Sequence, residues 1–191
     1  MQLVFATNNQ NKIKEIKLAL GKSFDVLSLK DINCNEELPE TQETLVGNAL
    51  QKAEYVYKNY QYNCFADDTG LVIPALNGEP GVYSARYAGE EKNAEANMQK
   101  VLEKLKGVTS RDAYFETAIA LIIDGKKHTF VGRVDGEILP QKAGAKGFGY
   151  DPIFKPNGFD ISFAQMTMEE KNAISHRGRA FRKMLAFLKD F

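Results

Sequence analysis

The sequence predicts an α/β fold, because segments typical of strands and of helices alternate along its 191 residues. The chain begins with a short apolar run, then a polar loop, then apolar residues at helical spacing, which is typical of a strand, a loop and a helix. Apolar stripes at helical spacing recur at 44–60 and 98–105. Two long apolar runs flank Asp124-Gly125, a strong signal for a β-hairpin.

The composition is that of an ordinary globular domain without a general charge bias. Hydrophobic residues make up 43% and charged residues 26%. The 25 Lys and Arg balance the 25 Asp and Glu, so the formal net charge is zero. A general binder of nucleic acid or of membrane surfaces usually carries a basic excess, so we expect neither partner. A charged ligand must then be met by a local cluster of charges.

The cysteines and histidines are too few for a disulfide framework or a Cys/His metal site. Cys34 and Cys64 are the only cysteines, and His128 and His176 are the only histidines. The N-terminus lacks the charged region and long apolar core of a signal peptide, and no apolar run approaches the roughly 20 residues of a membrane span. We therefore expect a single cytoplasmic domain over residues 1–191 with reduced thiols.

The first segment is predicted to be a strand over Gln2–Ala6, a polar loop over Thr7–Lys12 and a helix over 13–20 that stops at Gly21. The loop would lie at the helix N-terminus, where backbone N–H groups favour an anion such as phosphate. The loop lacks the glycine spacing of a Walker P-loop. An Asn-rich turn that only caps the helix would have the same residues.

A second strand is expected at Phe24–Leu29, followed by an acidic loop at 31–43 and a helix at Thr44–Tyr60. Gly47 inside this helix costs up to about 1 kcal/mol relative to Ala. Lys52 lies near the apolar stripe of the helix. It is either a snorkelling lysine or a cation directed at a ligand, and the spacing leaves both open.

The stretch Cys64–Gly70 has the strongest chemical pattern in the chain. Asp67 and Asp68 end a short apolar run, so we expect them at a strand end, where Gly70 lets the chain turn away sharply. Side chains alternate along a strand, so one carboxylate would point into a site and the other into its support. Adjacent carboxylates suit a hard cation such as Mg²⁺, although a lone acidic turn has the same pattern.

The second half is predicted to contain a short strand at 71–73, the hairpin strands 113–123 and 128–139 in the middle of the sheet, and a final amphipathic helix after Ser175. The loop 142–149 is glycine-rich and basic, and it runs into Tyr150-Asp151. Aromatic rings on such a loop favour contact with a flat ligand.

Five short motifs occur in order along the chain: Thr7-Asn8-Asn9 with Lys12, Phe65-Ala66-Asp67-Asp68-Thr69-Gly70, Pro80 to Tyr87, Gly147-Phe148-Gly149-Tyr150-Asp151-Pro152, and Ser175-His176-Arg177-Gly178. Together they resemble the inosine triphosphate pyrophosphatase family over essentially the whole chain. Members hydrolyse deaminated purine nucleoside triphosphates to the monophosphate and pyrophosphate. The resemblance implies an elongated, mixed, twisted sheet with surrounding helices, two lobes flanking a central cleft, and an Mg²⁺-dependent homodimer.

The resemblance also implies roles for individual residues. Asp68 would accept a proton and share the metal with Glu40, although the acidic loop also offers Glu36, Glu37 and Glu43. The loop at 7–12 would hold the triphosphate, 148–151 would frame the base and sugar, and three donors near the C-terminus would contact the base. The expected substrate-binding residues are Thr7, Asn8, Asn9, Lys12, Lys52, Thr69, Phe148, Gly149, Tyr150, Asp151, Lys171, His176 and Arg177.

Three positions differ from the common family pattern. Asn8 stands where many members have Gly, Thr69 replaces the commoner Ser, and Gly47 replaces a common Glu. None of these changes removes a group that the chemistry needs.

Two other functional classes compete with this enzyme. A catalytically silent nucleotide-binding module would keep the phosphate loop but would not need the carboxylates Glu40, Asp67 and Asp68. A nucleic-acid-binding protein would use the basic C-terminal segment, and its affinity would depend strongly on salt. The Asp-x-Asp nucleophile pattern of haloacid-type phosphatases does not match Asp67-Asp68-Thr69.

Overall fold

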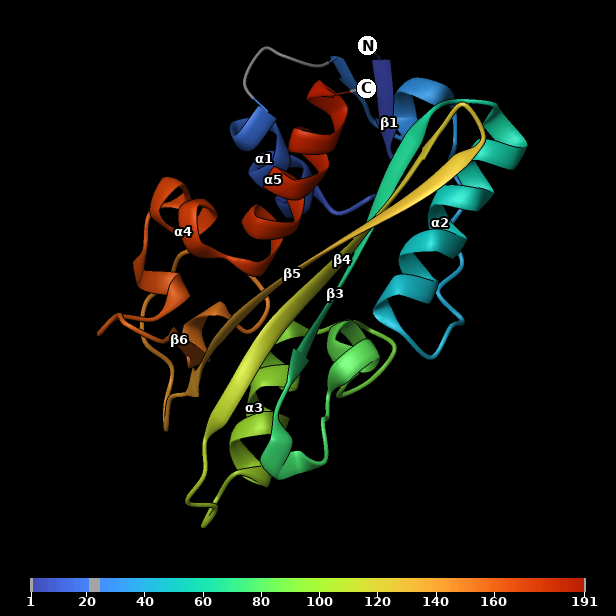
Figure 1. Cartoon of the computed structure of the whole chain (residues 1–191). Helices are drawn as coiled ribbons and strands as arrows, with labels where there is room; N and C mark the ends of the chain where they lie inside the picture. The colour runs from blue at the N-terminus through green and yellow to red at the C-terminus, as the bar shows by residue number, and fades with distance from the viewer. Residues whose placement is uncertain (1, 21–24, 191) are drawn as a thin grey trace. The chain divides into compact units, whose positions relative to one another are not determined.

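The computed structural model describes residues 2–20 and 25–190. Figure 1 shows its α-helices and strands along the chain. The strands are β1 Gln2–Phe5, β2 Asp25–Leu27, β3 Cys64–Val72, β4 Asp112–Ile123, β5 Lys126–Ile138 and β6 Phe154–Pro156. The α-helices are α1 Gln10–Leu20, α2 Leu45–Tyr60, α3 Ala94–Lys104, α4 Met168–Ile174 and α5 His176–Lys189. Short 3₁₀ segments are η1 Lys30–Ile32, η2 Pro74–Leu76, η3 Gly81–Arg86, η4 Asp151–Ile153 and η5 Phe163–Gln165.

The described strands form one mixed sheet in the order β2-β1-β3-β4-β5-β6. Strand β1 runs parallel to both β2 and β3, whereas β5 and β6 are antiparallel. The predicted mixed α/β class is therefore confirmed. The two lobes, the cleft and the elongated outline stay predictions.

Contacts along the chain divide it into two compact units. Unit 1 comprises Met1–Asp68, Thr117–Gly132 and Arg177–Phe191, and unit 2 comprises Thr69–Glu116 and Arg133–His176. The boundary passes through β3, β4 and β5, so these three strands contribute residues to both units. The prediction of a single domain stays a prediction.

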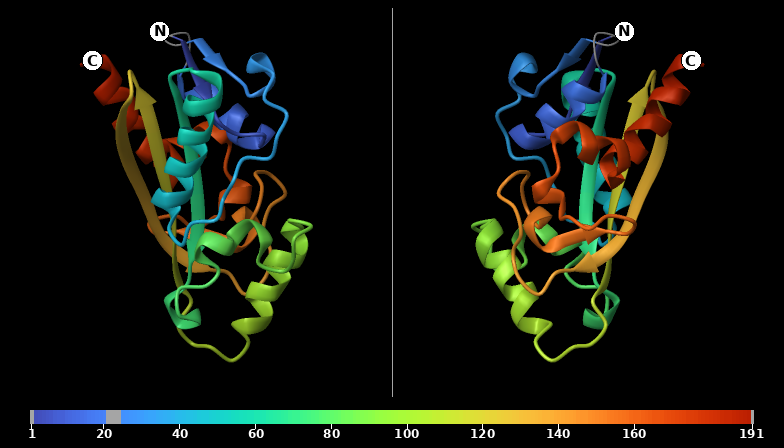
Figure 2. Two further views of the ribbon diagram at one scale, coloured as in Figure 1. Left: turned by 90° about the vertical axis from the view of Figure 1, so that its right-hand side faces the viewer. Right: turned by 90° about the vertical axis from the view of Figure 1, so that its left-hand side faces the viewer.

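Unit 1 packs helices on its part of the sheet. Its core joins Phe5 and Phe65 of neighbouring strands, whose rings stack at 4.6 Å between centroids, to Ile16 of α1 and Phe181 of α5. Helices α1 and α5 lie together on one side of these strands, and α2 lies on the other (Figure 2). The buried residues of α2 recur at the predicted helical spacing.

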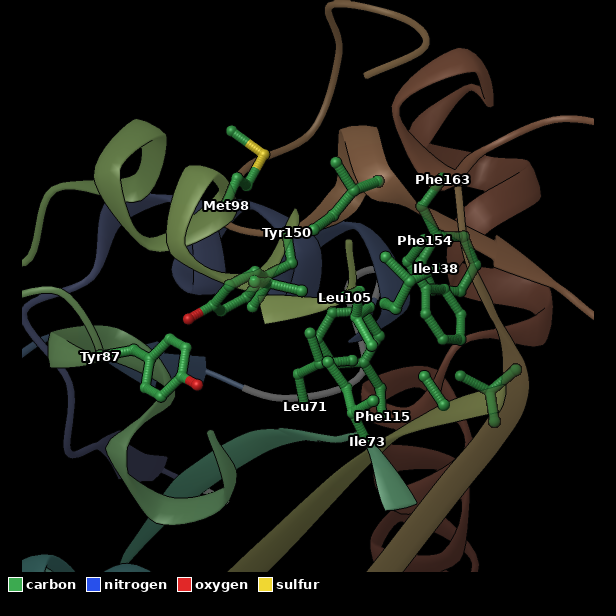
Figure 3. Packing of buried hydrophobic residues seen from close by; sticks show 14 of the residues in the cluster. Leu71, Ile73, Tyr87, Met98, Leu105, Phe115, Ile138, Tyr150, Phe154 and Phe163 are labelled. Atoms are coloured by element: carbon green, nitrogen blue, oxygen red, sulfur yellow. The ribbon is translucent and has the colours of Figure 1, made fainter. Parts of the chain in front are cut away.

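Unit 2 has its own aromatic core (Figure 3). Phe115 of β4 meets the ring of Phe154 edge-on at 4.7 Å between centroids, and Phe163 stacks nearby. Met98 and Val101 of α3 pack against the same cluster. Each unit thus buries a separate set of apolar side chains.

The predicted hairpin between β4 and β5 is confirmed. Its two turn residues, Asp124 and Gly125, both have positive φ, at 49° and 76°. Such a turn matches the right-handed twist of the flanking strands. Strand β4 lies inside the sheet as expected, and β5 lies between β4 and the edge strand β6.

The prediction that β3 ends at Asp67-Asp68 is wrong. The strand continues to Val72, Gly70 is extended rather than a turn, and the separate strand at 71–73 is the end of β3. The strand persists because both flanks of the acidic pair are buried and because Leu71 N donates to the hydroxyl of Ser84 at 2.9 Å.

The segment before the last helix contains more structure than the sequence pattern predicts. A further helix, α4, precedes Ser175, which ends α4 directly before α5. Helix α4 begins with a capping box, in which the side chains of Thr167 and Glu170 each accept from the other residue's backbone N–H. The expected helix stop at Gly21 and strand start at Phe24 lie outside the described residues.

Candidate active site

The candidate site lies where β1 ends and its neighbour β3 continues. Phe5 is the last residue of β1 and pairs with Phe65, and Ala6 N donates to Phe65 O at 2.8 Å. The chain then leaves the sheet as a loop, while β3 proceeds to Asp67 and Asp68. Ligands of α/β sheets commonly bind at the carboxyl end of a parallel strand, so this is the expected place for a site.

The loop after β1 is organised by its own side chains. Asn9 Oδ1 accepts from the backbone N–H groups of Asn11 and Lys12 at 3.0 and 3.2 Å, which caps α1. Asn9 N in turn donates to Thr7 Oγ1 at 3.2 Å. Part of the helix terminus predicted to bind phosphate is therefore occupied by Asn9. Asn8 and Asn9 are exposed, so the loop presents amide side chains to solvent.

Asp67 is a buried anion held by two cations. Lys12 Nζ donates to its Oδ1 at 3.0 Å, and Arg177 Nε donates to its Oδ2 at 3.1 Å. The Asp67 side chain has no exposed surface. Burial alone would raise the pKa of Asp67, but Lys12, Arg177 and Lys52 hold it well below its usual range. Asp67 is thus a permanent negative charge that orients cations.

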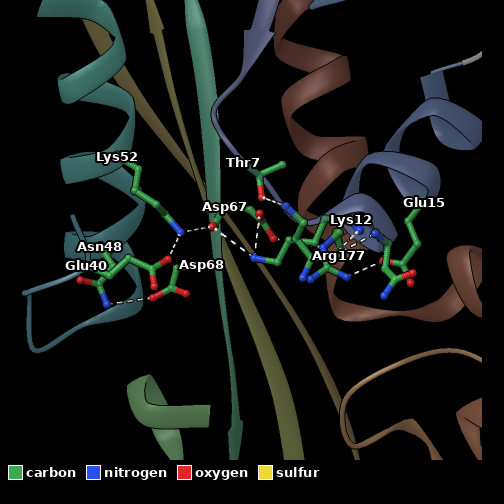
Figure 4. A network of polar contacts seen from close by, with 11 residues as sticks. Thr7, Lys12, Glu15, Glu40, Asn48, Lys52, Asp67, Asp68 and Arg177 are labelled. Atoms are coloured by element: carbon green, nitrogen blue, oxygen red, sulfur yellow. Dashed lines mark hydrogen bonds and ion pairs between the residues drawn. The ribbon is translucent and has the colours of Figure 1, made fainter. Parts of the chain in front are cut away.

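Asp68 points to the opposite side of β3, toward α2, whereas Asp67 faces α1 and α5 (Figure 4). The predicted division of the two carboxylates between the faces of the strand is confirmed. Asp68 Oδ2 accepts from Asn48 Nδ2 at 3.0 Å. Burial raises the pKa of Asp68, and nearby Glu40 adds to the rise. Asp68 is therefore better able than Asp67 to take up a proton.

Lys52 reaches across from α2 to the same strand. Its Nζ donates to Asp67 O at 2.8 Å and to a carboxylate oxygen of Glu40. Burial alone would lower the pKa of Lys52, but Asp68, Glu40 and Asp67 raise it. The snorkelling alternative is wrong, because the side chain of Lys52 is only 6% exposed.

The start of α2 explains the unfavourable Gly47. A Cβ there would lie 2.8 Å from Gln42 Cβ and 2.9 Å from Thr44 Oγ1, the oxygen that caps the helix by accepting from Gly47 N. Gln42 N also donates to Asn48 Oδ1 at 2.8 Å. These contacts fix the segment that carries Glu40. Glu36, one of the alternative acids, instead accepts from Tyr60 and Cys34.

The charged groups of this region suit a divalent metal. Three cations meet four carboxylates: Lys12, Lys52, Arg177, Glu15, Glu40, Asp67 and Asp68. Within residues 2–20 and 25–190, no three or more His, Cys, Asp or Glu side chains gather to hold a metal ion. Two carboxylates near each other fit Mg²⁺, which commonly takes one or two protein carboxylates and fills its shell with water and phosphate oxygens.

A second set of predicted residues gathers in unit 2 around Asp151. Its Oδ2 accepts from Lys171 Nζ at 2.6 Å and from Phe148 N at 2.9 Å. Both partners of the ion pair are 4% exposed. The Lys171 ammonium also lies 4.6 Å from the centroid of the Phe148 ring, a cation–π geometry. Asp151 therefore fixes both the aromatic loop and the lysine.

The other unit 2 residues are anchored as well. Tyr150 OH donates to Ser84 O at 2.7 Å, and the His176 ring stacks on Phe115 at 4.6 Å between centroids. Thr69 is partly buried on β3. The contacts of Tyr150 and His176 tie these two side chains to the buried core of unit 2.

Gly147 is required by the position of Asp151. Its φ is +74°, and a Cβ would lie 2.2 Å from Asp151 Oδ2. We expect Gly147→Ala to lower the free energy of unfolding by about 2–4 kcal/mol. It should also loosen the loop and Lys171, because both lose their shared carboxylate.

Gly158→Ala is the matched control for this prediction. Gly158 has a similar φ of +84°, but nothing lies within 4 Å of its Cβ position. Thermal unfolding should show only about 1 kcal/mol of loss for this variant. Equal losses for the two variants would contradict the role given to the Asp151 contact.

The structure thus sorts the predicted site residues into two sets. The unit 1 set contains Thr7, Asn8, Asn9, Lys12, Glu40, Lys52, Asp68 and Arg177, and the unit 2 set contains Thr69, Phe148, Gly149, Tyr150, Asp151, Lys171 and His176. Arg177, predicted to contact the base, falls in unit 1 beside Asp67 and Glu15. Its role in reading the base stays a prediction.

Sequence reasoning misses Glu15 and the role of Asp67 as the anchor of the cations. Glu15 does not stand out in the sequence, because helix α1 has other polar residues around it. A signal is nevertheless present, since Glu15 lies three residues after Lys12 and therefore on the same face of the helix.

Comparison with known proteins identifies the family of the chain. The model of the Ham1 family matches residues 3–187. A protein of Christiangramia forsetii named dITP/XTP pyrophosphatase is 57% identical over 188 residues, covering 98% of this chain and 99% of that protein. A Bacillus subtilis protein of the same name is 46% identical over 191 residues, covering 98% of this chain and 96% of its own length.

Solved structures share the whole fold. The Ham1 protein of Staphylococcus aureus is 42% identical with a TM-score of 0.90, covering 100% of this chain and 99% of that one. A HAM1 protein from Coxiella burnetii is 35% identical with a TM-score of 0.92, and both chains are covered completely.

Proposed function

This chain belongs to the Ham1 family, and from that premise we propose that it hydrolyses deaminated purine nucleoside triphosphates such as dITP, ITP and XTP. The products are the nucleoside monophosphate and pyrophosphate. The observation that carries the proposal is the cluster of buried charges around Asp67 and Asp68, where β1 ends. Removal of these nucleotides would keep them out of nucleic acid synthesis.

The triphosphate is assigned to the unit 1 set. Lys12 and Lys52 supply positive charge from α1 and α2, and Asp67 holds both, through its carboxylate and its backbone oxygen respectively. Thr7, Asn8 and Asn9 add hydroxyl and amide donors at the loop. Cations and donors held in advance stabilise the charge on the phosphate oxygens without reorganising at the moment of reaction.

Asp68 is the proposed proton acceptor. A water oxygen forms a bond to the α-phosphorus, the bond from that phosphorus to the bridging oxygen breaks, and pyrophosphate leaves. Asp68 takes the proton of the attacking water, for which its raised pKa and its place on β3 suit it. Asn48 keeps the carboxylate oriented through its hydrogen bond to Oδ2.

A divalent metal, Mg²⁺ in our proposal, would be held by Asp68 and Glu40. When bound, it would offset negative charge on the phosphates and lower the pKa of a bound water. The unit 1 cluster has four carboxylates and three cations, so it is negative by one charge. A triphosphate would add further negative charge, and this supports the need for a divalent metal.

The base is assigned to the unit 2 set. Phe148 offers flat apolar surface, Gly149 follows it, and buried Tyr150 and Asp151 hold the loop from the core, while Lys171 and His176 carry N–H donors. Donors directed at the 6-oxo group of hypoxanthine or xanthine would meet an amino group in adenine. A buried donor left unpaired in this way strongly disfavours the wrong substrate. Thr69 would contact the substrate through its hydroxyl.

Pyrophosphate release from ITP, XTP, GTP and ATP, with Mg²⁺ and with EDTA, tests the proposal. We expect rapid Mg²⁺-dependent release from ITP and XTP, and kcat/KM for ATP lower by roughly a hundredfold or more. Addition of EDTA should stop the reaction, and Mg²⁺ should restore it. A folded protein that binds ITP but releases no pyrophosphate would instead be a nucleotide-binding module.

Assembly and location complete the proposal. We propose a cytoplasmic homodimer, and light scattering during gel filtration should give about twice the 21.4 kDa of one chain. Over the parts of the chain that the structure describes, no helix is both long and apolar enough to cross a membrane.

A further inference from the structure

Glu15 is a buried charge that the proposed reaction does not use. Its side chain is 5% exposed, and one of its carboxylate oxygens accepts from Arg177 Nη1. It lies on α1 three residues after Lys12, on the same face of the helix. Buried carboxylates need a compensating partner, and Arg177 provides one. The pair therefore connects α1 to α5 next to Lys12, one of the proposed triphosphate contacts.

The four charges form an alternating chain: Glu15, Arg177, Asp67 and Lys12 (Figure 4). Asp67 is shared between the two cations. Its Oδ1 accepts from Lys12 at 3.0 Å, and its Oδ2 accepts from Arg177 Nε at 3.1 Å. The position of Lys12 thus depends on how Arg177 uses the same carboxylate.

A guanidinium and a carboxylate favour a bidentate pair, in which two N–H groups take both oxygens. Glu15 excludes the end-on form of that pair, which needs Nη1 and Nη2 together, because it holds Nη1 of Arg177 on the side of α1. With Nη1 fixed there, Arg177 approaches Asp67 through Nε, and Oδ1 stays with Lys12.

We propose that Glu15 is a positioning residue for Lys12: it anchors Arg177 so that Asp67 keeps one oxygen for the lysine that binds the phosphates. This inference rests on the proposed function for its kinetic consequence. Its structural consequence is independent of catalysis. Without the Glu15 charge, Arg177 turns Nη1 and Nη2 onto both oxygens of Asp67 and competes with the Lys12 ammonium for Oδ1, which moves Lys12 away.

The structural test is a crystal structure of Glu15→Gln, which keeps the size of the side chain and removes its charge. We expect Arg177 to be bidentate on Asp67, with Lys12 Nζ out of hydrogen-bond range of Oδ1. Lys12 still at about 3 Å from Oδ1 would overturn the proposal. This readout decides the inference even if the protein releases no pyrophosphate from ITP, the result that would sink the proposed function itself.

The kinetic test is a double-mutant cycle with Lys12→Ala. We expect Glu15→Gln to lower kcat/KM for ITP by about tenfold, the effect of losing a hydrogen bond to a charged group. In the Lys12→Ala background the same change should have less than about a twofold effect, because Glu15 acts through Lys12. A roughly tenfold loss of kcat/KM on adding Glu15→Gln to Lys12→Ala would overturn the proposal. An unchanged kcat/KM in Glu15→Gln alone would also overturn it.

Thermal unfolding of the same variants separates positioning from a purely structural role. If Glu15 only stabilised the fold, Glu15→Gln should lower the Tm by the same amount with Lys or with Ala at position 12. All variants are assayed below the temperature at which they begin to unfold. Glu54→Gln is the matched control, because Glu54 is also a unit 1 carboxylate paired with a lysine, Lys127, but is 47% exposed. Its kcat/KM should equal that of the unchanged protein.

Discussion

Asp68→Asn is expected to lower kcat for ITP by about 10³-fold, the typical contribution of a positioned general base. Asparagine keeps the shape of the side chain and can accept from Asn48 Nδ2, which now donates to Asp68 Oδ2 at 3.0 Å. It cannot take the proton of the attacking water, and it is a poorer ligand for a divalent cation. The loss should therefore appear in kcat at saturating Mg²⁺.

The same variant should fold at least as stably as the unchanged protein. Burial raises the pKa of Asp68, so the folded state disfavours the ionised carboxylate. A carboxyl whose folded pKa is raised destabilises the fold as pH rises past its ordinary pKa, and neutral asparagine avoids this cost. Without added metal, thermal unfolding at neutral pH should give an equal or higher Tm.

Asp135→Asn is the matched control for Asp68→Asn. Asp135 also lies on a strand, but its side chain is 53% exposed and pairs with the exposed Arg133. Its turnover should not change. If Asp68→Asn turned over ITP as fast as Asp135→Asn, Asp68 would have no role in the mechanism.

Lys12→Ala is expected to raise KM for ITP by about a hundredfold, because the triphosphate loses a charge-assisted hydrogen bond. The variant should also lose about 1–3 kcal/mol of unfolding free energy, because buried Asp67 keeps Arg177 but loses one of its two cations. Substrate titration and thermal unfolding measure the two effects separately.

Lys17→Ala is the control on the same helix, because Lys17 is exposed near the end of α1. Its KM and stability should stay near those of the unchanged protein. An unchanged KM for Lys12→Ala, with a loss of stability alone, would mean that Lys12 only neutralises Asp67.

The elements of the fold are determined by the sequence because their signals are local. Periodic apolar residues set α2 and α3, and the turn residues Asp124-Gly125 set the hairpin, since helix and strand each repeat at their own period. Alternation along a strand likewise predicts that Asp67 and Asp68 lie on opposite faces. The family motifs point to the enzyme class in the same way, because they are read in chain order.

The end of β3 and the pairing of the charges depend on tertiary structure. Gly70 allows a turn or an extended chain, and the extended form results from burial on both sides and from the Ser84 contact, which comes from a distant segment. Lys52 is equally ambiguous in the sequence, because an amphipathic pattern does not say whether a lysine at its border ends in water or on Asp67 O.

The clearest case is the pairing of Glu15 with Arg177, which are 162 positions apart. No local pattern connects α1 to the start of α5. Helices α1 and α5 pack on the same side of the strands and bring the two charges together away from water. A charge buried there needs a partner of opposite sign. The sequence therefore determines the elements and the types of catalytic group, whereas burial decides which charges orient one another.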